Sequence, residues 1–468
     1  MAMVETSARG PRNRRLLQKE KCLGQFPIST SIRYSRYTQR RRSTMIIFRF
    51  EKALAPRLLN LGLRALTMIC RLFLLLLLAR LIEPGELGLF GLVAATIAFS
   101  LYFLGFDFYV HTARELVRHP QADWGGLVKS QIALTGLTYL LATPILVFLF
   151  AEKVLPLFLA PWLAVLMVLE HVNQELSRLF IAIGSPIVAS LILFLRSGVW
   201  VLPLGILLLL NAEGLRLETV FLYWTFGGLL GAGFGAICLY RLELGGWSKR
   251  IDWHWIFRGL RIAIPFLAGT LCLRAIFTLD RYMFEAYLGL ETLAAYVLFV
   301  GIAATLNSFL EAGVFAFLYP ALVKHWGSKS AEAFRYTGRA LLSQVVTVCI
   351  VFSAFALLIL PFLLSWLDNE IYTDSKDLFY WLLIAMMLFV LSMIPHYSLY
   401  AQGLDKFIQL GHFLSLAVFV VTVLIVGAFD KFLSVPIALC VTFFMLLVVK
   451  SVACMLLTPP DYKWFSNK

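Results

Sequence analysis

Residues 79–90 read ARLIEPGELGLF, a short turn between two long apolar segments, 58–81 and 85–107. A membrane-spanning helix needs about 20 apolar residues, because a backbone in lipid has no water with which to form hydrogen bonds. Each flanking segment is long enough, and only Ile82, Glu83 and Pro84 separate them. This stretch therefore predicts two consecutive transmembrane helices joined by a tight connection.

The whole chain continues this pattern. Of its 468 residues, 60% are hydrophobic and 15% are charged, whereas soluble domains have about 25% charged residues. Disordered, collagen-like and small disulfide-rich proteins are excluded by the same figures. Twelve segments can span a membrane: 58–81, 85–107, 125–150, 154–172, 186–210, 218–240, 261–287, 291–320, 340–366, 378–400, 407–428 and 433–457. We predict an all-α polytopic membrane protein with about twelve transmembrane helices.

A second turn resembles the first and indicates an internal repeat. Residues 286–296 read AYLGLETLAAY, which is again a short turn with an acid that is followed by small and apolar residues and an aromatic. Transporters are often built from two related halves. The expected organisation is two pseudo-symmetric six-helix lobes, with these boundaries: N-lobe 58–240, linker 241–260, C-lobe 261–457 and C-terminal tail 458–468.

The net charge of +14 is concentrated in one place. Residues 1–57 contain 14 Lys and Arg but three acids. This basic tail is interpreted either as a disordered cytoplasmic segment that contacts anionic lipid or as a mis-start, with Met45 as the true first residue. A nucleic-acid role is the least favoured reading, and we expect no nucleic-acid partner.

The loop charges predict the orientation. Loops on the side of the tail, together with the C-terminus, carry 14 Lys and Arg, and the opposite loops carry four. Because basic loops stay in the cytoplasm, both termini are expected there, in a bacterial inner membrane. No loop is long enough for a nucleotide-binding domain and no P-loop motif occurs, which favours a carrier over an enzyme. The seven cysteines are scattered, so we expect no metal site and no cofactor.

Three stretches of the sequence resemble a known family. The turn at 81–90, the stretch 263–267 leading to Leu279-Asp280-Arg281, and the turn at 289–296 resemble Wzx-type polysaccharide flippases of the MOP (multidrug/oligosaccharidyl-lipid/polysaccharide) exporter superfamily. The resemblance implies a MOP/MATE-like fold with a cationic cavity and alternating access. It also implies movement of polyprenyl-diphosphate-linked oligosaccharides to the outer leaflet during O-antigen, capsule or exopolysaccharide synthesis. The partners would be membrane lipids and the polymerase and glycosyltransferases of the same pathway.

Arginines inside the apolar segments are the strongest pointers to a site, because a charge at mid-membrane costs at least about 2.5–3.5 kcal/mol. Arg71, Arg196 and Arg274 are expected near mid-depth, facing a cavity that binds a diphosphate. Arg64 shares a helix face with Arg71, since seven residues make nearly two turns. For Arg64, snorkelling to the headgroups is an equal alternative, and interhelical ion pairs remain possible for the other three.

Other ionisable residues suggest gates or coupling sites. Asp280 is interpreted as a gate ion-pair residue, a coupling-ion site, a partner for Arg196 or Arg274, or a structural hydrogen-bond acceptor. Arg281 is assigned to the same gate, although adjacent helical residues point about 100° apart and are poorly placed to pair. Glu311 is expected to line an inner gate with Asn307.

The remaining polar residues receive structural interpretations. Glu170, His171, Glu175 and Arg178 are expected as a charged face at the inner end of the fourth helix, and His396 and His412 as buried imidazoles. Two other functions stay open: a cation-coupled multidrug exporter of the same fold, and a non-transporting scaffold for glycosyltransferases. The exporter would need buried carboxylates, and the scaffold would not need the membrane arginines.

Overall fold

The computed structural model describes residues 42–210 and 216–464. The chain divides into two units, 1–55 and Pro56–Lys468, and the second unit contains the membrane-spanning stretches of the described residues. Most of the predicted basic tail, residues 1–41, lies outside the described residues. Helix α1 (Arg42–Leu81) begins inside the segment expected as tail, well before residue 58.

Every regular element in the described part of the chain is helical. Eleven helical stretches are long and apolar enough to cross a membrane. One of them, Trp253–Gly327, is long enough for two crossings and breaks at Gly289, where φ is 79°. Glycine adopts this left-handed conformation without a steric penalty. The break gives twelve spans, which confirms the predicted all-α transmembrane fold.

The first group of helices follows α1. Its elements are α2 (Pro84–Gly105), α3 (Tyr109–Arg118), α4 (Gln121–Ala151), η1 (Leu157–Leu159), α5 (Ala160–Ala182), α6 (Pro186–Phe194), η2 (Leu195–Val199), α7 (Val201–Leu210) and α8 (Leu217–Arg241). Helix α5 packs between α2 and α8, and η2 packs on α8. The segment η2 is π-helical, a rare geometry that recurs at functional sites.

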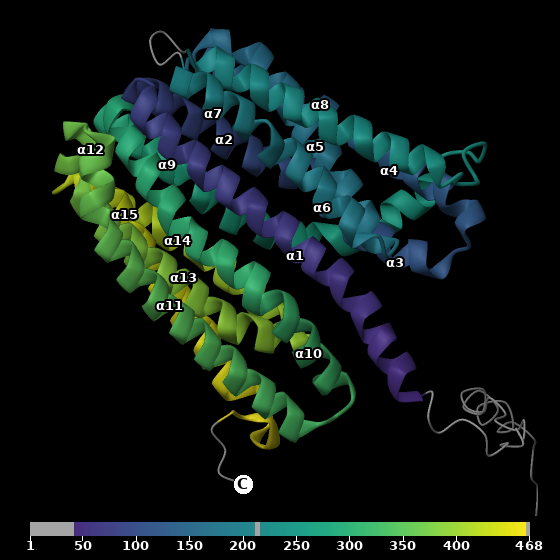
Figure 1. Ribbon diagram of the computed structural model, residues 1–468. Helices are drawn as coiled ribbons and strands as arrows, with labels where there is room; N and C mark the ends of the chain where they lie inside the picture. The colour runs from purple at the N-terminus through teal and green to yellow at the C-terminus, as the bar shows by residue number, and fades with distance from the viewer. Residues whose placement is uncertain (1–41, 211–215, 465–468) are drawn as a thin grey trace, which may run out of the picture. The chain divides into compact units, whose positions relative to one another are not determined.

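The second group contains the other six spans. Its elements are α9 (Trp253–Leu310), η3 (Glu311–Phe315), α10 (Ala316–Gly327), α11 (Ala331–Leu367), α12 (Glu370–Asp374), α13 (Lys376–Ala401), α14 (Asp405–Gly427), α15 (Lys431–Leu457) and η4 (Pro460–Tyr462). Helix α15 packs against α13, α14 and α9. Helix α9 begins inside the predicted linker 241–260, because the Asp252 side chain accepts a hydrogen bond from the Trp255 N–H and caps it. Figure 1 shows the two groups, with α1 running along their boundary.

One helix boundary differs from the prediction in a way that matters for function. The fourth span was expected over 154–172, but it consists of η1 and α5 and continues to Ala182. The polar residues from Glu170 onward made the sequence appear to leave the membrane there. The structure instead places Glu170 near the middle of the span, where it is buried. The expected interfacial position of Glu170 and His171 is therefore wrong.

Helices α2 and α9 form the main contact between the two groups. Two glycines of α2 allow this close approach. A Cβ atom at Gly88 would lie 2.4 Å from the backbone oxygen of Leu290, and one at Gly91 would lie 2.2 Å from Val297. Further along the seam, the hydroxyls of Thr96 and Tyr282 share a hydrogen bond. The groups are thus held together at the end where α2 begins.

We expect Gly88→Ala to open this seam, because the backbone of Leu290 cannot move aside as a flexible side chain would. Spin labels at the exposed positions Lys153 and Lys431, one in each group, report the distance between the groups. We expect electron–electron double resonance to show a longer distance between the two labels in Gly88→Ala. Gly85→Ala is the matched control, since a Cβ there meets nothing within 4 Å. An unchanged distance in Gly88→Ala would show that the seam tolerates the extra methyl group.

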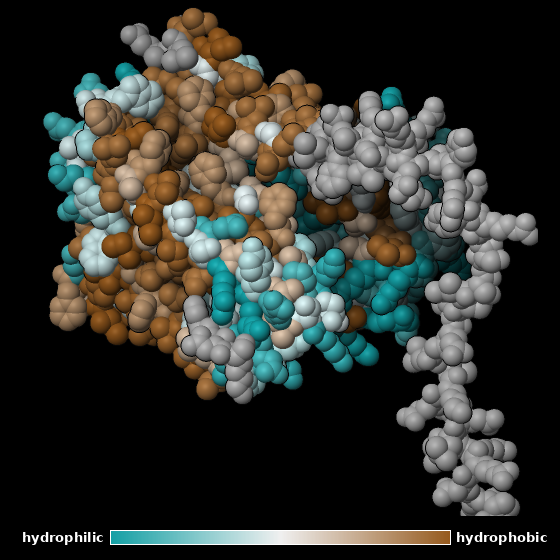
Figure 2. Space-filling model, turned by 60° about the horizontal axis from the view of Figure 1, so that its bottom comes forward, coloured by the Kyte–Doolittle hydropathy of each residue, from teal (hydrophilic) through white to brown (hydrophobic). Residues whose placement is uncertain are grey.

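The surface agrees with a membrane-embedded protein. Figure 2 shows hydrophobic side chains over the flank and hydrophilic ones gathered toward the end that faces the viewer. Many large apolar residues are exposed along the helices, among them Phe362 at 72% and Leu358 at 68%. Soluble monomers seldom expose continuous apolar surface of this kind. The chain is a multi-pass membrane protein.

Candidate functional site

A cavity of about 510 Å³ lies between the two groups, around the middle of the spans. Its walls come from α1, α2, α5, η2, α8 and both halves of α9. Three arginines line it: Arg71, Arg196 and Arg274. These are the three that the sequence placed near mid-depth, and the structure brings them to one cavity. Their role as substrate ligands stays a prediction.

Arg71 enters the cavity from α1. Its guanidinium donates a hydrogen bond of 2.8 Å to the Ser197 hydroxyl on η2, and the side chain remains exposed toward the cavity. Arg64 repeats this contact two turns earlier, where it donates to Ser190 on α6 at 3.2 Å. The two arginines share one helix face, as expected from their spacing, but Arg64 is not among the residues that line the cavity.

Arg196 is neutralised by Glu170, a carboxylate that was expected at the membrane interface. Its guanidinium lies 3.3 Å from Glu170 Oε2, and both side chains are nearly buried, at 11% and 8% exposure. The indole of Trp224 donates a hydrogen bond of 2.9 Å to the other oxygen of Glu170. The π-helical segment η2 carries Arg196, and with it Ser197, to this wall. The pair is one of the interhelical ion pairs left open above.

Arg274 reaches the cavity from α9 and lies over the ring of Tyr102, with 4.4 Å between the guanidinium carbon and the ring centroid. Such cation–π contacts stabilise a guanidinium without neutralising it. Within residues 58–464 as far as their side chains are described, neither Arg71 nor Arg274 forms an ion pair with a carboxylate. In the described part of the chain, the cavity therefore presents two arginines without a carboxylate in ion-pair contact and one ion-paired arginine.

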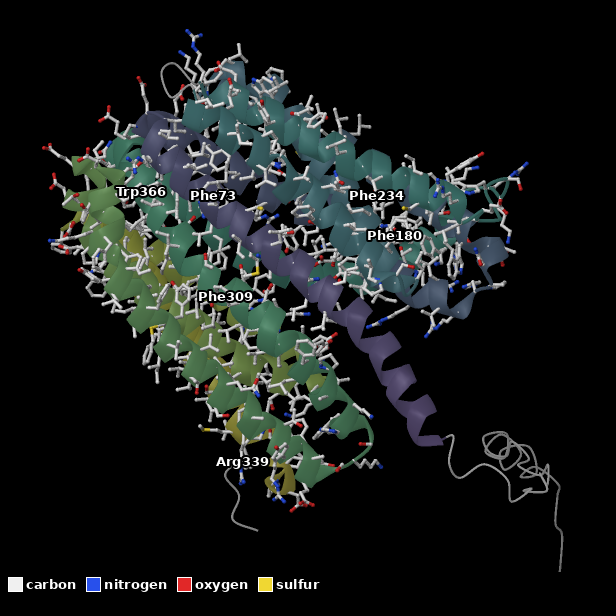
Figure 3. All side chains as sticks on the ribbon, in the orientation of Figure 1. Phe73, Phe180, Phe234, Phe309, Arg339 and Trp366 are labelled. Atoms are coloured by element: carbon white, nitrogen blue, oxygen red, sulfur yellow. The ribbon has the colours of Figure 1, made fainter. Side chains whose placement is uncertain are left out.

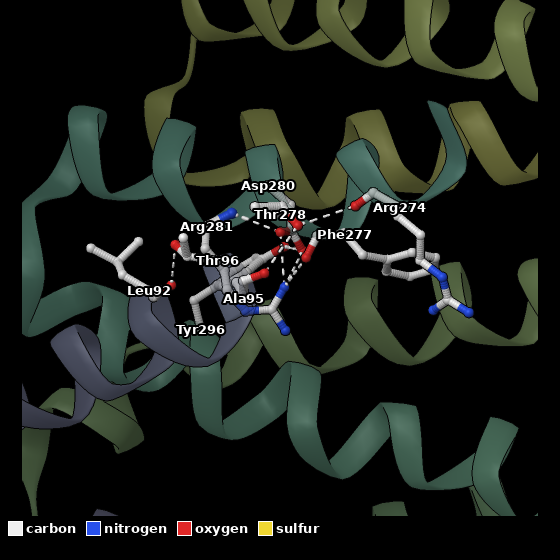
Figure 4. Close-up of polar contacts among 9 residues, drawn as sticks. All are labelled: Leu92, Ala95, Thr96, Arg274, Phe277, Thr278, Asp280, Arg281 and Tyr296. Atoms are coloured by element: carbon white, nitrogen blue, oxygen red, sulfur yellow. Dashed lines mark hydrogen bonds and ion pairs between the residues drawn. The ribbon is translucent and has the colours of Figure 1, made fainter. Parts of the chain in front are cut away.

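Asp280 lies at the seam, where it is 1% exposed. Figure 4 shows Arg281 folding back along α9, so that its guanidinium contacts Asp280 at 2.9 Å and also bonds the Phe277 carbonyl. Tyr296 donates a hydrogen bond of 2.8 Å to the same carboxylate. The expectation that Asp280 and Arg281 do not pair is wrong, because the long arginine side chain bends around the helix.

The two halves of α9, before and after Gly289, form the seventh and eighth spans. The hydrogen bond from Tyr296 to Asp280 links these two spans. We expect Asp280→Ala to lower the free energy of unfolding by about 3–5 kcal/mol, because Arg281 loses its buried partner. Tyr296→Phe should cost only about 1–3 kcal/mol, since one hydrogen bond is lost. Thermal unfolding in detergent measures both. Equal, small effects would mean that Asp280 is no structural anchor.

Glu311 does not lie in the cavity wall, although the nearby Ser308 does. It is exposed, begins the π-helical segment η3, and accepts a hydrogen bond of 3.1 Å from Asn307. The pairing of these two residues one turn apart agrees with their spacing. An inner-gate role for Glu311 stays a prediction. Among the described residues, no group of His, Cys, Asp and Glu is arranged to hold a metal ion.

Comparisons with known proteins identify the fold. Neither a family model nor a curated protein sequence matches the chain. Among solved structures, an inward-facing MATE family transporter of the MOP superfamily has a TM-score of 0.70 at 13% identity, over 86% of this chain and 97% of that one. The eukaryotic MATE transporter AtDTX14 has a TM-score of 0.58 at 14% identity, over 89% and 98%.

A MATE family transporter in the outward-facing conformation matches less well, with a TM-score of 0.53 at 14% identity over 86% of this chain and 95% of that one. These neighbours are transporters, and the identities are too low to carry over a substrate. The chain has the fold of the MATE transporters of the MOP superfamily.

Proposed function

We propose that this protein is a flippase that moves a polyprenyl-diphosphate-linked oligosaccharide from the cytoplasmic to the outer leaflet by alternating access. The observation that carries the proposal is the charge of the cavity. Arg71 and Arg274 line the cavity without carboxylate partners among the described residues, and Arg196 lines it with them. Guanidinium groups offer paired donors to phosphate oxygens, and they offset the loss of water around a diphosphate in the membrane.

An apolar groove next to the cavity supports a lipid-linked substrate. The groove has a volume of about 550 Å³ and is lined by α1, α9, α11 and α13. It shares the lining residues Leu72 and Thr305 with the cationic cavity, so the two lie side by side. Figure 3 shows Phe309, one of the groove's aromatic side chains, on α9. A charged headgroup beside a channel for hydrocarbon is the arrangement that an anionic amphiphile needs.

The multidrug alternative has one observation in its favour. Aromatic side chains line the same cavity, including Tyr102, Trp200 and Trp224, and such rings bind organic cations. Glu170 is the carboxylate that a cationic drug would need. It is already engaged by Arg196 and by the Trp224 indole, so a cation would have to displace a buried guanidinium. The scaffold alternative needs no cavity at all.

We infer the membrane and the topology of this transporter from the charge distribution of the sequence. We place the protein in a bacterial inner membrane with both termini in the cytoplasm, because the tail-side loops carry most of the basic residues. Its partners would then include membrane lipids and the polymerase and glycosyltransferases that use the same carrier lipid. Tagging each terminus with a reporter that is active on one side of the membrane checks this topology.

The purified protein in liposomes tests the proposal. A fluorescent polyprenyl-diphosphate-linked disaccharide is expected to move between leaflets, measured as protection from a membrane-impermeant quencher. An organic cation such as ethidium should neither be transported nor compete. Transport of ethidium without movement of the lipid would support the exporter instead. If neither moves while the protein is folded, the scaffold reading gains support.

A further inference from the structure

Three basic side chains meet inside the second group of helices. Lys450 of α15 is fully buried, and its Nζ lies 3.1 Å from Nδ1 of His396 on α13. The His396 ring stacks on that of His412 from α14, with 6.0 Å between centroids. His412 is 7% exposed, and its Nε2 has no hydrogen-bond partner in the described part of the chain. The cluster thus contains a buried imidazole nitrogen that has no hydrogen-bond partner among the described residues.

The surroundings of this cluster supply no negative charge. Helix α15 packs against α13, α14 and α9. Helices α13 and α14 contribute the two histidines, and α9 contributes Arg274, whose charge acts on His412. Over the described residues, no acid forms an ion pair with Lys450, His396 or His412. Arg274 also lines the central cavity, so the helix that packs against α14 and α15 carries a residue of the proposed substrate site.

The first group contains a polar cluster in which the charge is neutralised. There, Glu170, Arg196 and Trp224 lie on the fourth, fifth and sixth spans, and the carboxylate balances the guanidinium. The tenth, eleventh and twelfth spans carry His396, His412 and Lys450 instead. In the described part of these three spans, no carboxylate forms an ion pair with Lys450 as Glu170 does with Arg196.

We propose that Lys450, His396 and His412 form a proton-binding site whose occupancy changes during the transport cycle. An isolated buried charge is very costly, so the full burial of Lys450 favours the form without the extra proton. With the proton bound, the cluster carries a net positive charge beside Arg274 and is more stable in a conformation that admits water. Proton binding would therefore shift the balance between two packings of the helices.

The geometry provides a path for the proton. His396 is partly exposed whereas Lys450 is not, so His396 is the point of access. The Lys450 ammonium gives a proton to Nδ1 of a neutral His396, and Nε2 of the same ring gives its proton to water. The products are a neutral amine, a neutral imidazole of the other tautomer and a hydronium ion, so charge and atoms balance. Uptake reverses these steps.

The test does not depend on the identity of the substrate. Spin labels at Lys153 and Lys431, in a background without the native cysteines, report the separation of the two groups in purified protein between pH 5 and pH 9. We expect the wild-type distance distribution to change with pH. Lys450→Met, which keeps the length of the side chain, should remove most of that change. Lys406→Met, at an exposed position of α14, is the matched control and should titrate like wild type.

A wild-type protein whose distances do not vary with pH would overturn the proposal, and so would a Lys450→Met protein that still varies. His396→Gln gives a second test if Lys450→Met does not fold, and it too should lose at least half of the pH-dependent change. Failure of lipid flipping in liposomes would contradict the proposed substrate but would leave this result unaffected. The two proposals can therefore fail separately.

Discussion

Arg71→Ala and Arg274→Ala should each reduce flipping of a diphosphate-linked lipid at least tenfold, with normal insertion and amount of protein. Each guanidinium lines the cavity and has no carboxylate partner in the described residues, so each is available to the substrate. A hydrogen bond to a charged group contributes about 1.5–3 kcal/mol. Loss of one such contact in the transition state corresponds to roughly a 10- to 100-fold lower rate.

Two further variants sharpen this prediction. Arg274→Lys keeps the charge but loses the planar donor pair and the stacking on Tyr102, so its rate should fall between those of wild type and Arg274→Ala. Arg118→Ala is the matched control, because that arginine is 71% exposed and belongs to a surface pair in α3. Full transport activity in both Arg71→Ala and Arg274→Ala would contradict the cationic-cavity account and favour the scaffold.

Glu170→Ala is expected to have the largest effect on stability. It leaves the Arg196 guanidinium almost buried without its carboxylate, and it leaves the Trp224 indole without its acceptor. Removing one partner of a buried ion pair typically costs about 3–5 kcal/mol. Glu170→Gln should cost less, because the amide oxygen can still accept the indole hydrogen bond. Thermal unfolding in detergent measures the difference between the two variants.

The double variant Glu170→Met with Arg196→Met tests whether the unpaired guanidinium causes the loss of stability. Replacing both charges removes the unpaired guanidinium, so the double variant should be more stable than Glu170→Ala, although it loses a cavity arginine and should transport poorly. Asp123→Ala is the control, because it breaks an exposed ion pair with Lys249, which is worth about 0–1 kcal/mol. A Glu170→Ala protein as stable as Asp123→Ala would show that Arg196 does not depend on Glu170.

The apolar segments predicted most of the fold, and the reason is physical. Lipid requires long uninterrupted helices, so their number follows from hydropathy alone. The end of the fourth span was predicted about ten residues early, because its second half turns polar where it faces the protein interior. Glu170 was consequently placed at the interface. Sequence composition does not distinguish a polar residue that is buried between helices from one that lies at the membrane surface.

The candidate site was predictable only in part. The depth of Arg71, Arg196 and Arg274 followed from counting along each helix. Their partners did not, because pairing depends on how helices that are distant in sequence cross. Lys450 shows the same limit: it lies inside the last apolar segment, and only the packing of three helices brings it to His396. The Asp280–Arg281 pair was missed because arginine is long enough to bend back along its helix.

The central claim is that the cavity selects an anionic lipid, and its own tryptophans can report this. Trp200 and Trp224 line the cavity, so binding should change the intrinsic fluorescence. The measurement compares a polyprenyl-diphosphate-linked disaccharide with a neutral polyprenyl glycoside of the same chain length. We expect the diphosphate lipid to bind at least tenfold more tightly, and Arg274→Ala to remove most of that preference. Equal affinity for the two lipids in the wild-type protein would contradict the account.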